Sequence, residues 1–194
     1  MRPGCWFWDG QKNGTFDKVG LIVALVSKAP RRPGRTSLMK WMYFLKTLRK
    51  VPLFYRFRLY TYGPFDSDVI DDLDYAKFLG AVESRLVAYP GGRGYEYLRG
   101  PKADEMEGRA DKFLTRHKDS IDWVLREFGS RTAGDLETSS TIVYVDQSMA
   151  ERGTPSTFAE LARKVRAIKP HLSLDVIEGE ARALGKLTLL RSVA

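Results

Sequence analysis

The chain has 194 residues, of which 43% are hydrophobic and 29% charged, so it can bury a sizeable core like an ordinary globular protein. Its formal net charge of +8 indicates attraction to polyanions, above all nucleic acid. No apolar run approaches the roughly 18 residues of a membrane span, and the N-terminus lacks the apolar region of a signal peptide. We therefore expect a cytoplasmic protein without a membrane partner.

Two helices separated by a turn are expected at the start of the regular structure. Residues 16–28 place Val19, Ile22 and Val26 on one helical face, and the prolines and glycine of residues 30–34 end that helix. Thr36 or Ser37 then caps a second helix, in which apolar residues recur at spacings of three and four. The second helix should therefore bury one face and expose a basic one.

Basic residues are concentrated in this part of the chain. Between Lys28 and Phe65 there are ten basic residues and no acidic one. Such segregation predicts a basic face that attracts the phosphates of nucleic acid. The candidate nucleic-acid-binding residues in this run are Arg31, Arg32, Arg35, Lys46, Arg49 and Lys50.

The next segment shows the alternation of side chains that is typical of a β-strand, and an acidic helix follows it in the sequence. From Phe54 to Tyr62 every second side chain shares a face, and Gly63-Pro64 ends the pattern. The following sequence predicts a helix capped by Asp66 or Ser67 and stopped by Gly80. Its carboxylates are the candidate contacts to a basic protein partner: Asp66, Asp68, Asp71 and Asp72.

Residues 89–97, YPGGRGYEY, carry glycines spaced as in a tight turn. A phosphate-binding loop needs its glycines between a strand and a helix, and its nucleotide-binding form also needs Gly-Lys-Ser/Thr; neither condition holds here. The flanking sequences AVESRLVAY and YEYLRG predict two strands, hence a β-hairpin. Arg93 is expected at the exposed apex, where it can meet a phosphate; the alternative is an ordinary hairpin whose arginine binds nothing.

Beyond Pro101 the pattern predicts helices. Thr157 and Glu160 form a capping box for a helix that ends at Pro170, and a last helix starts at Ser173 and stops near Gly185. The predicted class is therefore α+β and mainly helical. Residues 15–100 are predicted to form a winged-helix-like domain with the hairpin as its wing, and residues 102–194 a helical C-terminal region.

Three stretches carry a resemblance to a known family: SLMKWMYFLKTL, FRLYTYGPFDSDVIDDLDYAKFLGAVE and DLETSSTIVYV. They resemble the YwgA-like family of prokaryotic winged-helix proteins over roughly residues 15–146. The pieces LMKWMYF and YGP are more distantly similar to the SocA-like antitoxin domain. The resemblance implies a winged-helix scaffold, often found near mobile or defence functions, and it carries over no catalytic residue.

Two functional hypotheses follow. In the first, a transcriptional regulator or an antitoxin-like, defence-associated factor binds DNA phosphates through the basic run and Arg93. The helix before the wing would normally enter the major groove, but here its carboxylates would be repelled by phosphates, so it is not expected to touch DNA. In the second, the protein is a dimeric interaction or adaptor module whose acidic helix docks a basic partner without binding nucleic acid.

Catalysis is not expected. The acidic residues 66–72 could in principle assemble an Mg²⁺ site, but a solvated first turn explains them without a metal. One cysteine, Cys5, and two distant histidines, His117 and His171, supply neither a disulfide nor a zinc site. No motif calls for a cofactor. Aromatic residues that could stack on single-stranded bases are Trp6, Trp8, Trp41, Tyr60 and Tyr62, although most aromatics at such spacings belong to a core.

Overall fold

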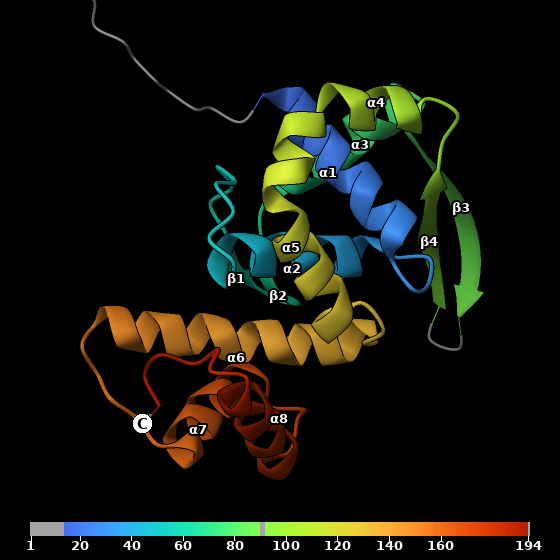
Figure 1. Ribbon diagram of the computed structural model, residues 1–194. Coiled ribbons are helices and arrows are strands. Elements are labelled where there is room, and N and C mark those ends of the chain that lie inside the picture. Colours follow the sequence, from blue (N-terminus) through green and yellow to red (C-terminus); the bar gives the residue numbers. More distant parts are fainter. Residues whose placement is uncertain (1–13, 90–91, 194) are drawn as a thin grey trace, which may run out of the picture.

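A computed structural model describes residues 14–89 and 92–193. Within these ranges the chain forms eight helices and two antiparallel hairpins of two strands each, which confirms the prediction of a mainly helical α+β fold (Figure 1). The N-terminal elements are α1 (Thr15–Lys28), α2 (Arg35–Thr47), β1 (Arg58–Tyr60), β2 (Gly63–Phe65), α3 (Ser67–Phe78), β3 (Val82–Tyr89) and β4 (Gly92–Arg99). The later helices are α4 (Ala103–Arg109), α5 (Asp111–Phe128), α6 (Ala133–Glu151), α7 (Phe158–Ile168) and α8 (Leu174–Lys186).

Side-chain caps begin four of the eight described helices, α3, α6, α7 and α8. The prediction that Thr36 or Ser37 caps the second helix is wrong, because α2 begins at Arg35 after Gly34. Asp66 caps α3 by accepting a hydrogen bond from the backbone N–H of Asp68 at 3.0 Å, and Gly80 follows the helix with φ of 72°. Thr157 and Glu160 form the expected capping box at the start of α7. These ends lie where the sequence predicts them.

The segment predicted as one strand is divided. Only residues 58–60 form a strand, and Gly63-Pro64 begins β2 instead of ending the sheet, so a short β1–β2 hairpin replaces a single long strand. The predicted alternation is nevertheless present, because Phe54, Arg56 and Arg58 are exposed while Leu53 and Tyr55 are buried. The extended segment before β1 therefore packs one side against the core.

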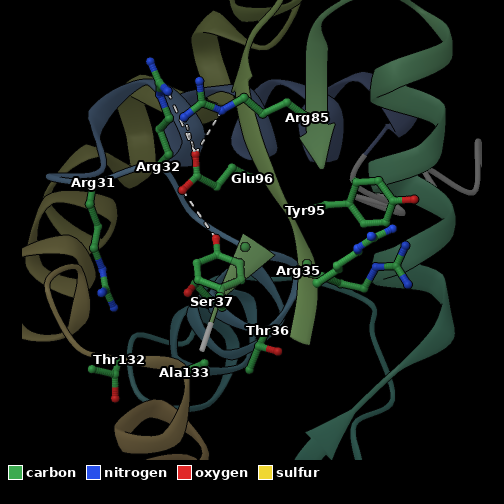
Figure 2. Close-up of a pocket in the computed structure, with 14 residues that line it drawn as sticks. Arg31, Arg32, Arg35, Thr36, Ser37, Arg85, Tyr95, Glu96, Thr132 and Ala133 are labelled. Carbon is green, nitrogen blue, oxygen red and sulfur yellow. Dashed lines mark hydrogen bonds and ion pairs between the residues drawn. The ribbon is translucent and has the colours of Figure 1, made fainter. Parts of the chain in front are cut away.

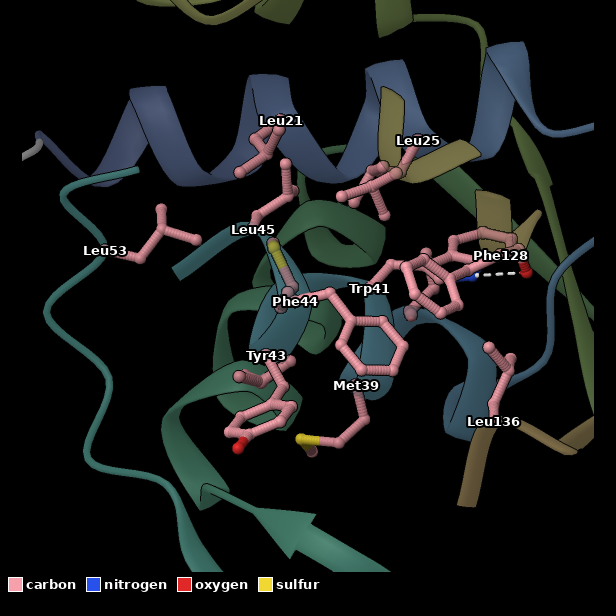
Figure 3. Close-up of a cluster of buried hydrophobic side chains, with 14 of the residues drawn as sticks. Leu21, Leu25, Met39, Trp41, Tyr43, Phe44, Leu45, Leu53, Phe128 and Leu136 are labelled. Atoms are coloured by element: carbon pink, nitrogen blue, oxygen red, sulfur yellow. Dashed lines mark hydrogen bonds between the residues drawn. The ribbon is translucent and has the colours of Figure 1, made fainter. Parts of the chain in front are cut away.

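One hydrophobic core joins elements from both halves of the chain. The ring of Phe44 in α2 stacks on Phe128 in α5 with centroids 4.1 Å apart, and Trp41 donates a hydrogen bond through Nε1 to the carbonyl of Phe128 at 3.2 Å (Figure 3). At Gly20 a Cβ would lie 2.3 Å from the Cβ of Ala110, so glycine allows α1 to approach the α4–α5 junction closely. The core therefore crosses the predicted boundary near residue 101.

Helix α6 lies between the N-terminal elements and the pair α7 and α8, while the β3–β4 hairpin runs along the right flank of the N-terminal elements (Figure 1). The start of α6 and the start of α2 both lie near the hairpin, because both line the same groove. Among the described residues, no helix is long and apolar enough to cross a membrane.

Candidate nucleic-acid interface

A groove of about 820 Å³ lies where the β3–β4 hairpin meets the starts of α2 and α6. Five exposed guanidinium groups line it, and we call it the arginine groove. Its arginines are Arg31, Arg32, Arg35, Arg85 and Arg93. Four of the five were candidate nucleic-acid-binding residues, so the structure brings residues 31–35 and the hairpin arginine together.

Backbone pairing fixes the hairpin beside the turn before α2. The N–H of Tyr97 donates to the carbonyl of Pro33 at 2.9 Å, and Gly34 forms an isolated antiparallel bridge with Glu96. The turn of residues 30–34 is therefore held against one edge of β4. This pairing places arginines that are distant in sequence around one strand.

The two faces of the hairpin carry different arginines. The register pairs Arg85 with Glu96, Leu86 with Tyr95, and Ala88 with Arg93. Because side chains alternate along a strand, Arg85 and Glu96 share one face, and Tyr95 and Arg93 share the other. Figure 2 shows Glu96 with Arg32 and Arg85 on one side of β4, and Tyr95 with Arg35 on the opposite side. Arg93 is the second residue of β4 and pairs with Ala88, whereas the sequence predicted it at the apex; Pro90 and Gly91 lie outside the described residues.

Glu96 neutralises part of one face. Its carboxylate lies 3.0 Å from Arg85 and 3.9 Å from Arg32, and it accepts a hydrogen bond from the hydroxyl of Tyr89 at 3.4 Å. A carboxylate held between two guanidinium groups occupies the position that an anionic ligand would take. These two arginines are therefore partly satisfied within the protein.

The other three arginines of the groove can bind a ligand, because they have no acidic partner among the described residues. In residues 14–89 and 92–193, neither an ion pair nor a side-chain hydrogen bond is formed by Arg31, Arg35 or Arg93. Helix α2 begins beside them, and its N-cap, Gly34, has no side chain to cap the first N–H groups. The partial positive charge of that helix end adds to the charge of the guanidinium groups.

The remaining basic candidates lie at the other end of α2. Lys46 and Lys50 line a separate hollow of about 390 Å³ together with Arg56 and Glu151. Both lysines donate to backbone carbonyls, Lys46 to that of Tyr55 and Lys50 to that of Thr47. Lys46 lies eleven residues along α2 from Arg35, a rise of about 17 Å, and Lys50 lies beyond the end of the helix. The predicted basic face is therefore two sites instead of one.

Arg49 and two of the acidic candidates interact with other side chains or backbone groups of the protein. The guanidinium of Arg49 lies over the ring of Trp123, 5.1 Å from its centroid. Asp66 caps α3, and Asp72 pairs with Lys18 at 3.0 Å and accepts a hydrogen bond from Tyr55 at 2.8 Å. Two of the four acidic candidates thus support the fold itself.

Asp68 and Asp71 are exposed on α3, together with Asp74, Tyr75 and Phe78. The rings of Tyr75 and Phe78 are stacked with centroids 6.3 Å apart, and Phe78 is 82% exposed. This outward surface of α3 combines negative charge with large aromatic side chains. We call it the α3 face.

Four groove residues with charged or aromatic side chains were not candidates from the sequence: Arg85, Tyr89, Tyr95 and Glu96. Once β3 and β4 are predicted, the pairing of Tyr89 with Gly92 places Arg85 opposite Glu96 by register alone. The strand register was the missing piece of information. Among the aromatics considered for stacking, Trp41 is buried, Tyr60 and Tyr62 are exposed outside the arginine groove, and Trp6 and Trp8 lie outside the described residues.

Metal-ligating side chains do not cluster in the part of the chain that the structure describes. No three His, Cys, Asp or Glu side chains are grouped there as a metal ion would require. The acidic residues of α3 therefore show no cation site. His117 packs its ring 4.6 Å from that of Phe113, and burial lowers the pKa of His117, so its role is in packing.

Comparison with known proteins gives no match. No protein-family model matches the chain, and neither a curated protein nor a solved structure is significantly similar to it.

Proposed function

We propose that the protein is a winged-helix nucleic-acid-binding protein that holds phosphates in the arginine groove. It acts as a transcriptional regulator or as an antitoxin-like, defence-associated factor, in line with the family resemblance of its sequence. The observation that carries the proposal is the convergence of Arg31, Arg35 and Arg93, all without an acidic partner among the described residues, on one groove. Guanidinium groups bind phosphate oxygens in a fixed, bidentate geometry that lysine does not reproduce.

The order of the elements supports this proposal. The chain runs α1, α2, β1–β2, α3 and then the β3–β4 hairpin, and in a winged helix a hairpin after the third helix forms the wing. A wing carrying arginines contacts the phosphate backbone whatever the base sequence. The exposed carboxylates of α3 would be repelled by phosphates, so contact is made through the hairpin and the start of α2.

The test measures the affinity of the protein for a labelled random-sequence 30-mer, both as a duplex and as a single strand. Fluorescence anisotropy at low salt reports the binding. The variant Arg31→Gln/Arg35→Gln/Arg93→Gln should bind at least about tenfold more weakly, a loss of roughly 1.4 kcal/mol. The control variant Arg163→Gln/Lys164→Gln/Lys186→Gln removes the same charge from exposed positions on α7 and α8. Equal affinity of the wild type and the groove variant would overturn the proposal.

The α3 face supports a second candidate function. Exposed aromatic rings beside carboxylates have the composition of a protein interface, since Tyr and Phe contribute large contact areas there. The protein would then be a dimeric adaptor that docks a basic surface. Sedimentation equilibrium tests this, because Asp71→Asn/Phe78→Ser should dissociate the dimer. A wild-type monomer at tens of micromolar would contradict this second function.

A further inference from the structure

Two tyrosines lie on opposite faces of the β3–β4 hairpin and line the arginine groove. Tyr89 is 47% exposed and shares a face with Arg85, while Tyr95 is 48% exposed and shares a face with Arg93. Exposed aromatic rings beside guanidinium groups are the usual elements of a site for single-stranded nucleic acid. Each face of the hairpin therefore offers one ring and at least one arginine.

Gly94 explains the position of the Tyr89 ring. A Cβ at residue 94 would lie 3.1 Å from Cε2 and 3.5 Å from Cδ2 of Tyr89. The ring therefore packs over the backbone of β4 at a position where a Cβ would displace it slightly. Since nearly half of the side chain remains exposed, the ring can also stack against a base.

The placement of the arginines favours a flexible ligand. Arg31 lies on the Glu96 side of β4, and Arg35 and Tyr95 lie on the other side (Figure 2). The strand register places Tyr89 on the Glu96 side as well. A rigid duplex contacts such a hairpin mainly from one side. A single strand can bend around it and reach both sides. The groove volume of about 820 Å³ also matches a small ligand segment instead of a duplex.

We propose that the arginine groove binds single-stranded nucleic acid, with bases stacked on Tyr89 and Tyr95 and phosphates held by Arg31, Arg35 and Arg93. This inference rests on the proposed function and specifies its ligand. Stacking tolerates every base, so binding is strong for mixed sequences and carries little sequence preference.

The test compares a labelled 15-nucleotide single strand of mixed sequence with the blunt duplex of the same sequence. The single strand should bind at least about tenfold more tightly. Tyr89→Ala and Tyr95→Ala should each weaken its binding about fivefold or more, because base stacking on an aromatic ring contributes about 1–3 kcal/mol. Tyr89→Phe and Tyr95→Phe keep the ring and should restore the affinity. Tyr62→Ala removes a ring that is 68% exposed outside the groove and should change nothing.

A second readout does not depend on affinity. A strand containing bromouridine should photo-crosslink to Tyr89 or Tyr95, as identified by mass spectrometry of the digested complex. Crosslinks confined to Tyr60 or Tyr62 would overturn the inference. Crosslinks at the groove tyrosines support it even if one alanine variant unfolds.

The outcomes separate the inference from the proposed function. Equal or tighter binding of the duplex would overturn the single-strand inference and leave the nucleic-acid function standing. Binding of neither nucleic acid would overturn both. A free nucleotide, tested as labelled ATP, offers the same base and phosphate chemistry; tighter binding of ATP than of the 15-mer would show that the groove takes a small nucleotide and would overturn the inference.

Discussion

Glu96 is the residue at which the opposing charges of the arginine groove meet. Its carboxylate lies 3.0 Å from the guanidinium of Arg85 and 3.9 Å from that of Arg32, and it accepts a hydrogen bond from the hydroxyl of Tyr89. A carboxylate in that position organises the two guanidinium groups but also repels an incoming phosphate. Because the pairs are partly exposed, the repulsion is the larger effect on ligand binding.

Glu96→Gln should therefore raise the affinity for nucleic acid about threefold to tenfold at low salt, since removing one nearby negative charge at a surface site is worth about 1 kcal/mol. Anisotropy titrations of the wild type and the variant measure the change. Glu178→Gln, which removes a carboxylate paired with Arg182 on α8, is the matched control and should leave affinity unchanged. A fall in affinity for Glu96→Gln would mean that the carboxylate is needed to position the arginines.

The sequence predicted some residues of the groove and missed others. The basic run identified Arg31, Arg32 and Arg35, because charge clustering is visible along the chain. Arg85 and Glu96 depend on strand register, which a change of one residue in turn length reverses. The same register explains why Arg93 lies within β4 and not at the apex.

At the scale of elements, Lys40 connects α2 to β2. Its side chain is 2% exposed, and its ammonium donates a hydrogen bond to the carbonyl of Pro64 at 2.8 Å. Burial lowers the pKa of Lys40 to about 8; the Glu137 carboxylate opposes this shift and Lys169 adds to it. A buried charge at the junction of α2 and β2 therefore costs stability at neutral pH.

Stability should rise with pH because of this lysine. Between pH 8 and the ordinary lysine pKa near 10.5, the unfolded chain holds a proton on Lys40 that the folded chain releases, so unfolding becomes less favourable as pH rises. Urea unfolding between pH 7.5 and 9.5 should show a gain of up to about 2 kcal/mol from Lys40 that Lys40→Met lacks. Burial also lowers the pKa of Lys46, and its contribution is common to both proteins. Burial raises the pKa of Tyr43 and Tyr55, whose ionisation in the unfolded chain lowers stability only near pH 10 and above, outside this window.

Lys112→Met is the control for this prediction, because Lys112 is an exposed lysine on α5. It should keep the wild-type pH profile. Parallel profiles for the wild type and Lys40→Met would contradict the role given to Lys40.

The elements themselves show which signals are local. The bounds of α3 and α7 follow from Asp66, Gly80, Thr157 and Glu160, which act within one turn of a helix. The division of β1 from β2 does not follow from such local signals, because it depends on contact with α6. Gly63 has φ of 84°, and a Cβ there would lie 2.9 Å from Oγ1 of Thr141. A contact between residues so far apart in sequence leaves no periodic pattern.

At the scale of the whole molecule, the shared core predicts joint unfolding of residues before and after position 101. The Phe128 side chain is buried and its ring contacts those of Phe44 and Trp123, so Phe128→Ala should lower the free energy of unfolding by about 3–5 kcal/mol. Phe78→Ala, at an exposed position, should change it by less than about 0.5 kcal/mol. Urea unfolding followed by far-UV circular dichroism and by tryptophan fluorescence should give one coincident transition. Two separated transitions would contradict the single core.

The class of the fold was accessible from the sequence because helix periodicity and caps are strong signals over residues 103–186. The arginine groove was accessible only in part, since it is assembled from the turn before α2, the β3–β4 hairpin and the start of α6. Those three segments are far apart in the chain, and composition shows their charge without showing that they meet.

Whether the arginine groove binds phosphates is decided by the salt dependence of single-strand binding, measured for the wild type and for Arg31→Gln/Arg35→Gln/Arg93→Gln. For single strands, each phosphate contact contributes about 0.7 to the slope of log K against log salt. Three lost contacts should reduce the magnitude of the slope by about 2, while Arg163→Gln/Lys164→Gln/Lys186→Gln should keep the wild-type slope. A groove variant with the wild-type slope would contradict the assignment of the arginine groove as the phosphate-binding site.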